Sequence, residues 1–290
     1  MTAARVAVVG SANLDVVVMM DLLPAPGETV IGDRVSEVAG GKGLNQAVAA
    51  ARYAPSTFVG CVGRDQAAQR LEEALVRAGV ETRHLQRSNL HTGRAFISVA
   101  ADGENSIVVL PLANEALDPD HVLTALDAVA PAVVLTQLEI PFHVVESVAT
   151  WTEANGARFV LNPSPIRSLP ATLLARCDPL ILNASEARAI LRSMGENEPV
   201  DTMRAAQALA VHTSTIVVTD GGRGAWVGSA QTGISLIVGH PVQVRDTTGA
   251  GDEFAGVLTA HLAHGVTLER AAEPANHAAA RLVRLHRDER

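Results

Sequence analysis

The sequence predicts an α/β protein whose mostly parallel sheet is covered by helices on both faces. The chain has 290 residues, 48% of them hydrophobic, which is enough to build a large buried core. Short runs rich in β-branched residues alternate along it with longer segments rich in alanine and leucine. No linker, internal repeat or low-complexity tract divides the chain, so we expect one domain over residues 1–290. Ligands are expected at the carboxyl ends of the parallel strands.

Six short apolar runs are typical of buried strands because they are β-branched and end in polar or small residues. They cover residues 6–10, 58–63, 133–138, 158–162, 179–183 and 215–219. Longer amphipathic segments follow most of them and predict helices. These cover residues 45–54, 66–79, 120–130, 142–156, 184–195 and 202–212.

Two regions, residues 12–38 and 84–112, break the alternation of strand and helix. The second contains an Asp-Gly turn at 102–103 between two runs of alternating polarity, which is typical of a β-hairpin. Because the two regions share this character, we expect them to form one small β-sheet inserted into the α/β body, acting as a lid.

Composition excludes several classes of partner. The formal net charge of -8 would repel nucleic acids and anionic membranes, so neither is expected as a partner. The two cysteines, Cys61 and Cys177, lack metal-site or disulfide-framework spacing, which predicts buried thiols in a reducing compartment. The N-terminal apolar run VAVV is too short for a signal peptide or a membrane span. We therefore expect a cytoplasmic protein.

The segment DTTGAGDEF, residues 246–254, carries the strongest indication of chemistry. Residues 241–246 have a strand-like pattern and a helical face follows from Phe254, so the segment predicts a strand-to-helix turn. The free N–H groups of such a helix start can bind a phosphate. Asp252 would then accept a proton from an attacking hydroxyl, and Asp246, at the strand end, would fix the turn or bind a cation.

A purely structural interpretation of this segment also exists. Glycine turns before helices are common, and Asp252 could be an ordinary acidic residue of a first helical turn. Other phosphate-binding patterns fit less well, because Phe254 stands where GxGxxG needs its third glycine and the chain contains no GxxxxGK[ST].

A second glycine turn, GGKGLNQA at residues 40–47, contains Lys42, the single lysine among 23 basic residues. A compact ammonium can enter a crowded pocket that a planar guanidinium cannot, which favours a ligand contact over a solvated surface charge. After the first predicted strand, Ser11, Asn13 and Asp15 alternate and so share one face. With Asn45 they suit a polyhydroxylated ligand, although turn residues would show the same pattern.

Three weaker features follow other predicted strands. Glu139 follows one strand, Asn183 and Glu186 form an N-x-x-E after another, and TDGGRG at 219–224 is a glycine-rich turn after a third. A carboxylate and an amide at a strand end suit a hydrated Mg²⁺ that carries nucleotide phosphates. A helix N-cap at Asn183 is the alternative explanation.

Taken together, GGKGLNQA and DTTGAGDEF resemble the two signature segments of the PfkB carbohydrate kinase family, and its ribokinase branch most. The segments GSANLD, PAPGETV, QLE, NPSP, N-x-x-E and TDGGRG also occur in the family's order, so the resemblance covers nearly the whole chain.

This resemblance implies an ATP-dependent transfer of the γ-phosphoryl group to the 5-hydroxyl of D-ribose. By matching position it implies that Asp252 is the base and that Gly249, Ala250 and Gly251 form the anion hole. The implied sugar contacts are Asn13, Asp15, Gly41, Lys42, Asn45 and Glu139. The implied nucleotide contacts are Asn183, Thr219, Gly221, Gly224 and Asn276. The resemblance further implies Mg²⁺ near Glu186 through water, K⁺ near Asp246 and Thr248, and a homodimer formed through the lid.

The chain also departs from the family pattern. After Asn276 it continues as HAAARLVRLHRDER, without the glycine-containing turn that is usual there, and Pro111 and Leu112 replace another glycine turn. Glu253 adds an uncommon acid beside Asp252. Two alternatives therefore stay open: a kinase of another sugar or of a nucleoside, and a catalytically silent protein of the same fold that binds sugar or nucleotide. A dinucleotide oxidoreductase is disfavoured because its fingerprint is missing.

Overall fold

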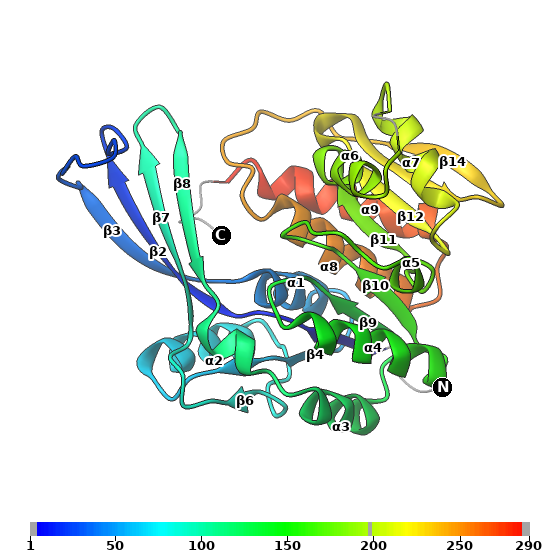
Figure 1. The fold of residues 1–290 in the computed structure, drawn as a ribbon, viewed down its shortest axis with the longest axis horizontal. Coiled ribbons are helices and arrows are strands. Elements are labelled where there is room, and N and C mark those ends of the chain that lie inside the picture. The colour runs from blue at the N-terminus through cyan, green and yellow to red at the C-terminus, as the bar shows by residue number, and fades with distance from the viewer. Residues whose placement is uncertain (1–4, 197–198, 286–290) are drawn as a thin grey trace.

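The structure is a computed structural model that describes residues 5–196 and 199–285, and it contains the predicted α/β sheet (Figure 1). Eight strands form the large sheet in the order β14-β13-β12-β11-β10-β9-β1-β4. The six from β12 to β4 run parallel, and β13 and β14 are antiparallel. The strands are β1 (Val6–Val9), β4 (Ser56–Val59), β9 (Val133–Thr136), β10 (Arg158–Leu161), β11 (Leu180–Asn183), β12 (Ile216–Thr219), β13 (Gly224–Ser229) and β14 (Gly233–Val238).

Helices cover both faces of this sheet, as predicted. Because side chains alternate along a strand, Val6 and Val8 enter one core while Ala7 and Val9 enter the other. The first core is covered by α1 (Lys42–Ala51), α2 (Gln66–Arg77), α8 (Ala250–Ala263) and α9 (Leu268–Leu282). The second is covered by α3 (Pro119–Val129), α4 (Phe142–Asn155), α5 (Ala171–Leu174), α6 (Ala184–Ser193) and α7 (Thr202–Ala210). Cys61 and Cys177 are buried in the second core as free thiols, and burial raises the pKa of Cys61 to about 11.

Two predicted strands differ from the structure. The run 58–63 is interrupted at Gly60, and its second half becomes β5 (Cys61–Val62), which pairs with β6 (Gln86–Arg87) in a separate two-stranded sheet. The predicted strand at 241–246 is wrong, because this segment is irregular. Its Arg245 and Asp246 N–H groups donate to the carbonyl of Val283, so the segment follows the end of α9 instead of joining the sheet.

A second sheet of four strands, in the order β3-β2-β7-β8, projects from the body (Figure 1). Its strands are β2 (Asn13–Met20), β3 (Arg34–Gly40), β7 (Gly93–Ala100) and β8 (Asn105–Leu110). The pairs β2–β3 and β7–β8 are antiparallel, as expected of hairpins, and β2 pairs with β7 in parallel at the centre. Segments far apart in sequence therefore build one small sheet.

The chain returns from the small sheet to the body through Pro111 and the 3₁₀ helix η1 (Leu112–Ala116). Leu112 has a positive φ of 49°, a conformation that costs a residue other than glycine roughly 1–3 kcal/mol. Nearby, the buried Asn114 side chain accepts from the N–H of Ala12 at 3.0 Å and donates to Asn13 Oδ1 at 2.8 Å. Asn114 thus ties this return to the start of β2.

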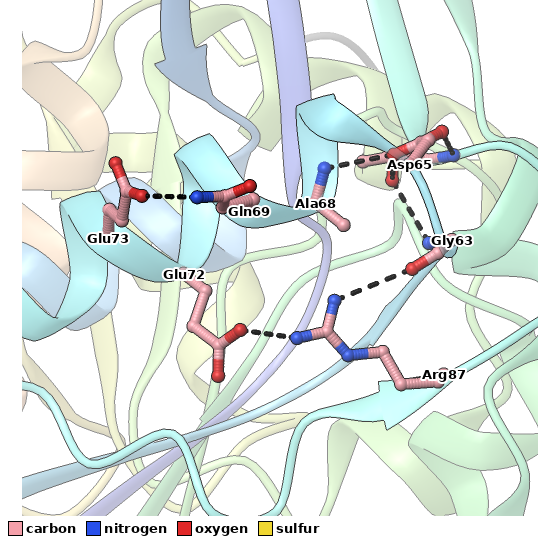
Figure 2. Close-up of polar contacts among 8 residues, drawn as sticks. Gly63, Asp65, Ala68, Gln69, Glu72, Glu73 and Arg87 are labelled. Atoms are coloured by element: carbon pink, nitrogen blue, oxygen red, sulfur yellow. Dashed lines mark hydrogen bonds and ion pairs between the residues drawn. The ribbon is translucent and has the colours of Figure 1, made fainter.

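Asp65 anchors the same end of the small sheet, at the start of β7 (Figure 2). Its Oδ1 accepts from the N–H of Ala68, which caps α2, and from the Thr92 hydroxyl at 2.6 Å. Its Oδ2 accepts from the N–H of Thr92, the residue before β7. Burial alone would raise the pKa of Asp65, but the hydrogen bonds from Thr92 and Ala68 outweigh it and hold the pKa at about 2.

No helix within the described ranges has the length and apolar character needed to cross a membrane.

The low pKa of Asp65 predicts a pH-dependent contribution to stability. Its folded pKa lies below the value of about 4 in an unfolded chain, so the contribution is present above pH 4 and is lost as the pH falls toward 2. Replacing Asp65 with Asn should therefore lower the free energy of unfolding by about 2 kcal/mol at pH 6, and by progressively less below pH 4. Urea unfolding between pH 6 and pH 3 measures this difference.

Asp201→Asn is the matched control, because Asp201 also caps a helix but accepts a single backbone N–H, that of Arg204. A loss that is constant with pH in Asp65→Asn, or equal in the two variants, would contradict the anchoring role.

Candidate functional site

Three cavities meet at the N-terminus of α8. The first, of about 460 Å³, is bordered by Asp15 and Asn45, and the second, of about 450 Å³, by Thr219 and Asn276. A third cavity of about 240 Å³ is bordered by Asp252 and lies between them. Gly249 borders the first and third cavities, and Gly251 borders the second and third. The glycine turn predicted to bind an anion therefore lies where the three spaces join.

The start of α8 has the properties of an anion site. Gly249 is the N-cap residue with a positive φ of 74°, which glycine adopts without strain. No side chain caps the helix start, so the first N–H groups and the positive end of the helix dipole face the cavities. The expected strand before this turn is absent, which means that Asp246 does not lie at a strand end. Its Oδ1 instead accepts from the N–H of Thr248 at 2.8 Å and so fixes the turn.

Asp252 is buried, with 7% of its surface exposed, and it borders the third cavity. Two side chains from α1 hold its carboxylate: Gln46 donates to Oδ1 at 2.9 Å and Asn45 donates to Oδ2 at 3.2 Å. This contact requires α1 and α8 to pack closely, and Gly256 allows it, because a Cβ there would lie 2.4 Å from the carbonyl oxygen of Gln46. Asp252 is thus a fixed acceptor beside an anion site.

Glu253 points away from Asp252. Its buried carboxylate forms an ion pair with Arg52, the half-exposed C-cap residue of α1. The uncommon acid therefore adds a second side-chain link between α1 and α8.

The small sheet and the first glycine turn supply the polar wall of the first cavity. Asn13 pairs with Gly40 and Asp15 with Val38 between β2 and β3, and both polar residues are buried. Asp15 and Asn45 border the cavity. The contacts of Glu139 fix the glycine turn, because its Oε2 accepts from the Ser11 hydroxyl at 2.6 Å and from the Lys42 N–H at 3.1 Å.

Lys42, Asn183 and Glu186 border the third cavity together with Asp252. The hydrogen bonds of Asn183 and Glu186 are those of a capping box: Asn183 Oδ1 accepts from the N–H of Glu186, and Glu186 Oε2 accepts from the N–H of Asn183, both at 2.9 Å. The helix-cap explanation therefore accounts for their contacts with each other, and their position places them beside the predicted base.

The second cavity is bordered by four of the predicted nucleotide contacts and by many apolar residues. Thr219, Gly221, Gly224 and Asn276 border it, and Asn276 Nδ2 donates to the carbonyl of Ile237 at 3.0 Å. The rest of its wall is formed by the residues Gly222, Gly239, His240, Pro241, Val242, Val244, Thr247, Ala250, Gly251, Phe254, Ala279, Ala280 and Val283. A largely apolar cavity next to an anion site suits a nucleobase attached to phosphates.

Comparison with known proteins agrees with this geometry. The family model described as "pfkB family carbohydrate kinase" matches residues 3–288. The chain belongs to the pfkB family of carbohydrate kinases.

Its relatives within this family are similar along most of their length. The kinase is 36% identical to the ribokinase of Bacillus subtilis over 95% of this chain and 91% of that one. It is 38% identical to the ribokinase of Haemophilus influenzae over 86% and 82% of the two chains. The solved structure of Arabidopsis thaliana ribokinase complexed with ribose and ATP is 30% identical, with a TM-score of 0.87 over 98% of this chain and 94% of that one.

The sequence analysis did not single out three amide side chains that lie near Asp252. Gln46, Gln137 and Asn162 form a buried hydrogen-bonded group that reaches Asp252. Gln46 follows a glycine turn, and Gln137 and Asn162 lie in the last residues of predicted strands. These positions were the available signal, but an amide there is equally common as a simple capping or turn residue.

The link between Arg52 and Glu253 predicts a stability effect. Replacing Arg52 with Met leaves the buried Glu253 carboxylate unpaired and should lower the free energy of unfolding of the kinase by about 2 kcal/mol. Adding Glu253→Gln should recover part of this loss, because it removes the buried charge. Urea unfolding of the single and double variants measures both effects.

Arg77→Met is the control, since Arg77 makes an exposed ion pair with Glu73 at 3.9 Å and its loss should cost less than about 0.5 kcal/mol. Equal losses of unfolding free energy in Arg52→Met and Arg77→Met would contradict a stabilising role for the ion pair between Arg52 and Glu253 beyond that of an exposed pair.

Proposed function

We propose that this protein is a ribokinase, which transfers the γ-phosphoryl group of ATP to the 5-hydroxyl of D-ribose. The observation that carries the proposal is the position of Asp252: a fixed carboxylate beside an uncapped helix start, in a cavity that shares Gly249 with the first cavity and Gly251 with the second. The ribokinases of Bacillus subtilis and Haemophilus influenzae support the choice of ribose.

In this proposal the sugar occupies the first cavity. The Asp15 carboxylate and the Asn45 amide border this cavity and offer hydrogen bonds to the sugar's hydroxyl groups. We assign Asn13 and Gly41, next to them where β2 and β3 meet α1, as further sugar contacts. ATP occupies the second cavity, with its base against the apolar wall near Asn276 and its phosphates directed toward Gly251. The acceptor hydroxyl and the γ-phosphate then meet in the third cavity, beside Asp252 and Lys42.

The residues present can carry out the transfer by positioning and charge. Asp252 accepts the proton of the attacking hydroxyl, and the N–H groups at Gly249, Ala250 and Gly251 stabilise the charge on the transferring phosphoryl oxygens. Lys42 adds a positive charge in the same cavity. These roles match the chemistry of phosphoryl transfer, which asks little covalent chemistry of the protein.

The donor set also fits a divalent metal of the kind that ATP-using kinases require. Within the described ranges no three His, Cys, Asp or Glu side chains gather around a metal-sized site. Mg²⁺ suits such a setting because it keeps waters and takes ligands from phosphates. Glu186, through water, is the residue we assign to it, and Mg²⁺ there would neutralise phosphate charge. We assign K⁺ to the turn that contains Asp246 and Thr248; equal rates in K⁺ and Na⁺ would contradict that assignment.

We further propose that the small sheet is a lid that closes over the sugar and that it pairs with its copy in a homodimer. Val108 lies opposite Phe96 across β7 and β8, and both are exposed, as is Val35 on the same face. Pairing would bury this apolar face, which is otherwise in contact with water. Sedimentation at micromolar concentration tests the proposal, and a monomer would contradict it. We place the reaction in the cytoplasm, where ATP is supplied.

The base assignment predicts the effect of one substitution. Replacing Asp252 with Asn should lower kcat for ribose phosphorylation by roughly 100-fold or more and leave the dissociation constant for ribose largely unchanged, because the base acts in the transition state. A coupled ATP-consumption assay measures kcat, and calorimetry measures ribose binding. A variant with near-normal kcat would contradict the role of Asp252.

The same assay distinguishes the alternatives. A panel of pentoses, 2-deoxyribose, hexoses and nucleosides with ATP and Mg²⁺ identifies the acceptor, and a higher kcat/KM for another member would replace ribose. Sugar binding without turnover of any acceptor would instead indicate a silent binding protein.

A further inference from the structure

A chain of buried amides runs from the large sheet to Asp252. Gln137, one residue after β9, donates from Nε2 to Gln46 Oε1 at 2.7 Å. Gln46 in turn donates from Nε2 to Asp252 Oδ1 at 2.9 Å and to Asn162 Oδ1 at 3.0 Å. Asn162, one residue after β10, donates to the carbonyl of Ile181 in β11 at 3.0 Å. The ends of three neighbouring strands are thus connected to the predicted base.

The hydrogen bonds fix the direction of every amide in this chain. The carbonyl of Ile181 can only accept, so Asn162 must turn its NH₂ group toward it and its Oδ1 toward Gln46. Gln46 then uses both hydrogens of its NH₂ group, one on Asn162 and one on Asp252. Its Oε1 faces Gln137, which must therefore donate. A reversed Gln46 amide would place an oxygen against the Asp252 carboxylate.

This arrangement leaves one polar atom unpaired. Gln137 is fully buried, and its Oε1 is one of four buried side-chain atoms without a hydrogen-bond partner within the described ranges. It lies against Gly10, where a Cβ would be 2.1 Å away. An unpaired buried acceptor destabilises the fold, so stability alone gives no reason for an amide at this position.

We propose that Gln137 and Gln46 are positioning residues that act in series to aim the Asp252 carboxylate at the acceptor hydroxyl. Lys42 borders the same cavity as Asp252 and would attract its carboxylate. Amide donors from Gln46 and Asn45 hold the two oxygens from the opposite helix, α1, so the carboxylate keeps one orientation. Gln137 acts one step earlier, by keeping the NH₂ group of Gln46 directed at Asp252. The inference rests on the function proposed for Asp252.

The test compares Gln137→Met, Gln46→Met and the double variant with the intact kinase, using the acceptor that the wild type phosphorylates best. Gln137→Met should lower kcat roughly 10-fold, the size expected for a misdirected catalytic group, while KM for the sugar changes less than about 2-fold. Its melting temperature should stay close to that of the wild type, because one unpaired acceptor, Gln137 Oε1, is exchanged for another, Gln46 Oε1.

Action in series makes the effects non-additive. In the Gln46→Met background, Gln137→Met should lower kcat no further, because the link that it orients is already lost. Gln86→Met is the matched control: Gln86 also uses both ends of its amide, to the carbonyl of Ala116 and the N–H of Asp118, but lies away from the site. Its kcat should equal that of the wild type.

The outcomes distinguish a failure of this inference from a failure of the proposed function. A wild type that phosphorylates a sugar, with unchanged kcat in Gln137→Met, refutes the amide chain alone, as do additive effects in the double variant. A wild type without turnover on any acceptor refutes both. If Gln137→Met does not fold, Gln137→Leu serves instead, because it also removes the Nε2 donor to Gln46 and its side chain is shorter. That variant should show the same fall in kcat at unchanged KM, and a kcat equal to the wild type would refute the chain.

Discussion

Close packing of α1 against α8 is the contact on which the site depends. Gly256 brings the two helix backbones together, and this proximity lets Asn45 and Gln46 reach the Asp252 carboxylate across the interface. The ion pair between Arg52 and Glu253 connects the same helices about two turns farther along α1. Since α1 begins at one glycine turn and α8 at the other, this packing also sets the distance between the two turns.

The large sheet supplies the fixed frame for this helix pair. Its parallel strands end at one edge, and the residues just beyond them, including Gln137 and Asn162, contact α1 from that edge. The uncapped start of α8 therefore faces three cavities at once. In the proposed function, this one short turn contacts the sugar side, the nucleotide side and the space between them, and so brings the acceptor and the phosphoryl group together.

Local sequence patterns predicted most of the fold and singled out Asp252 as a candidate site residue. They were insufficient where contacts between residues far apart in the chain determine the structure. The alternation of strands and helices was sufficient for both helical layers, and the glycine turn with Asp252 could be singled out as a candidate anion site beside a purely structural interpretation. The segment 241–246 has a strand pattern, yet its N–H groups bond to the end of α9, a partner that lies outside any local window. The role of Gln46 was equally hidden, because it depends on Asp252, 206 residues away.

The polar groups that β2 and α1 offer to the first cavity and the groups at the start of α8 belong to different parts of the chain. Asp15 and Asn45 come from β2 and α1 near the N-terminus, whereas residues 249–252 form the start of α8 near the other end. A graft of residues 13–40 from a relative with another preferred sugar would thus exchange the small sheet's β2–β3 hairpin and leave α8 untouched. This modular layout allows the specificity of such an enzyme to diverge while its chemistry is inherited unchanged.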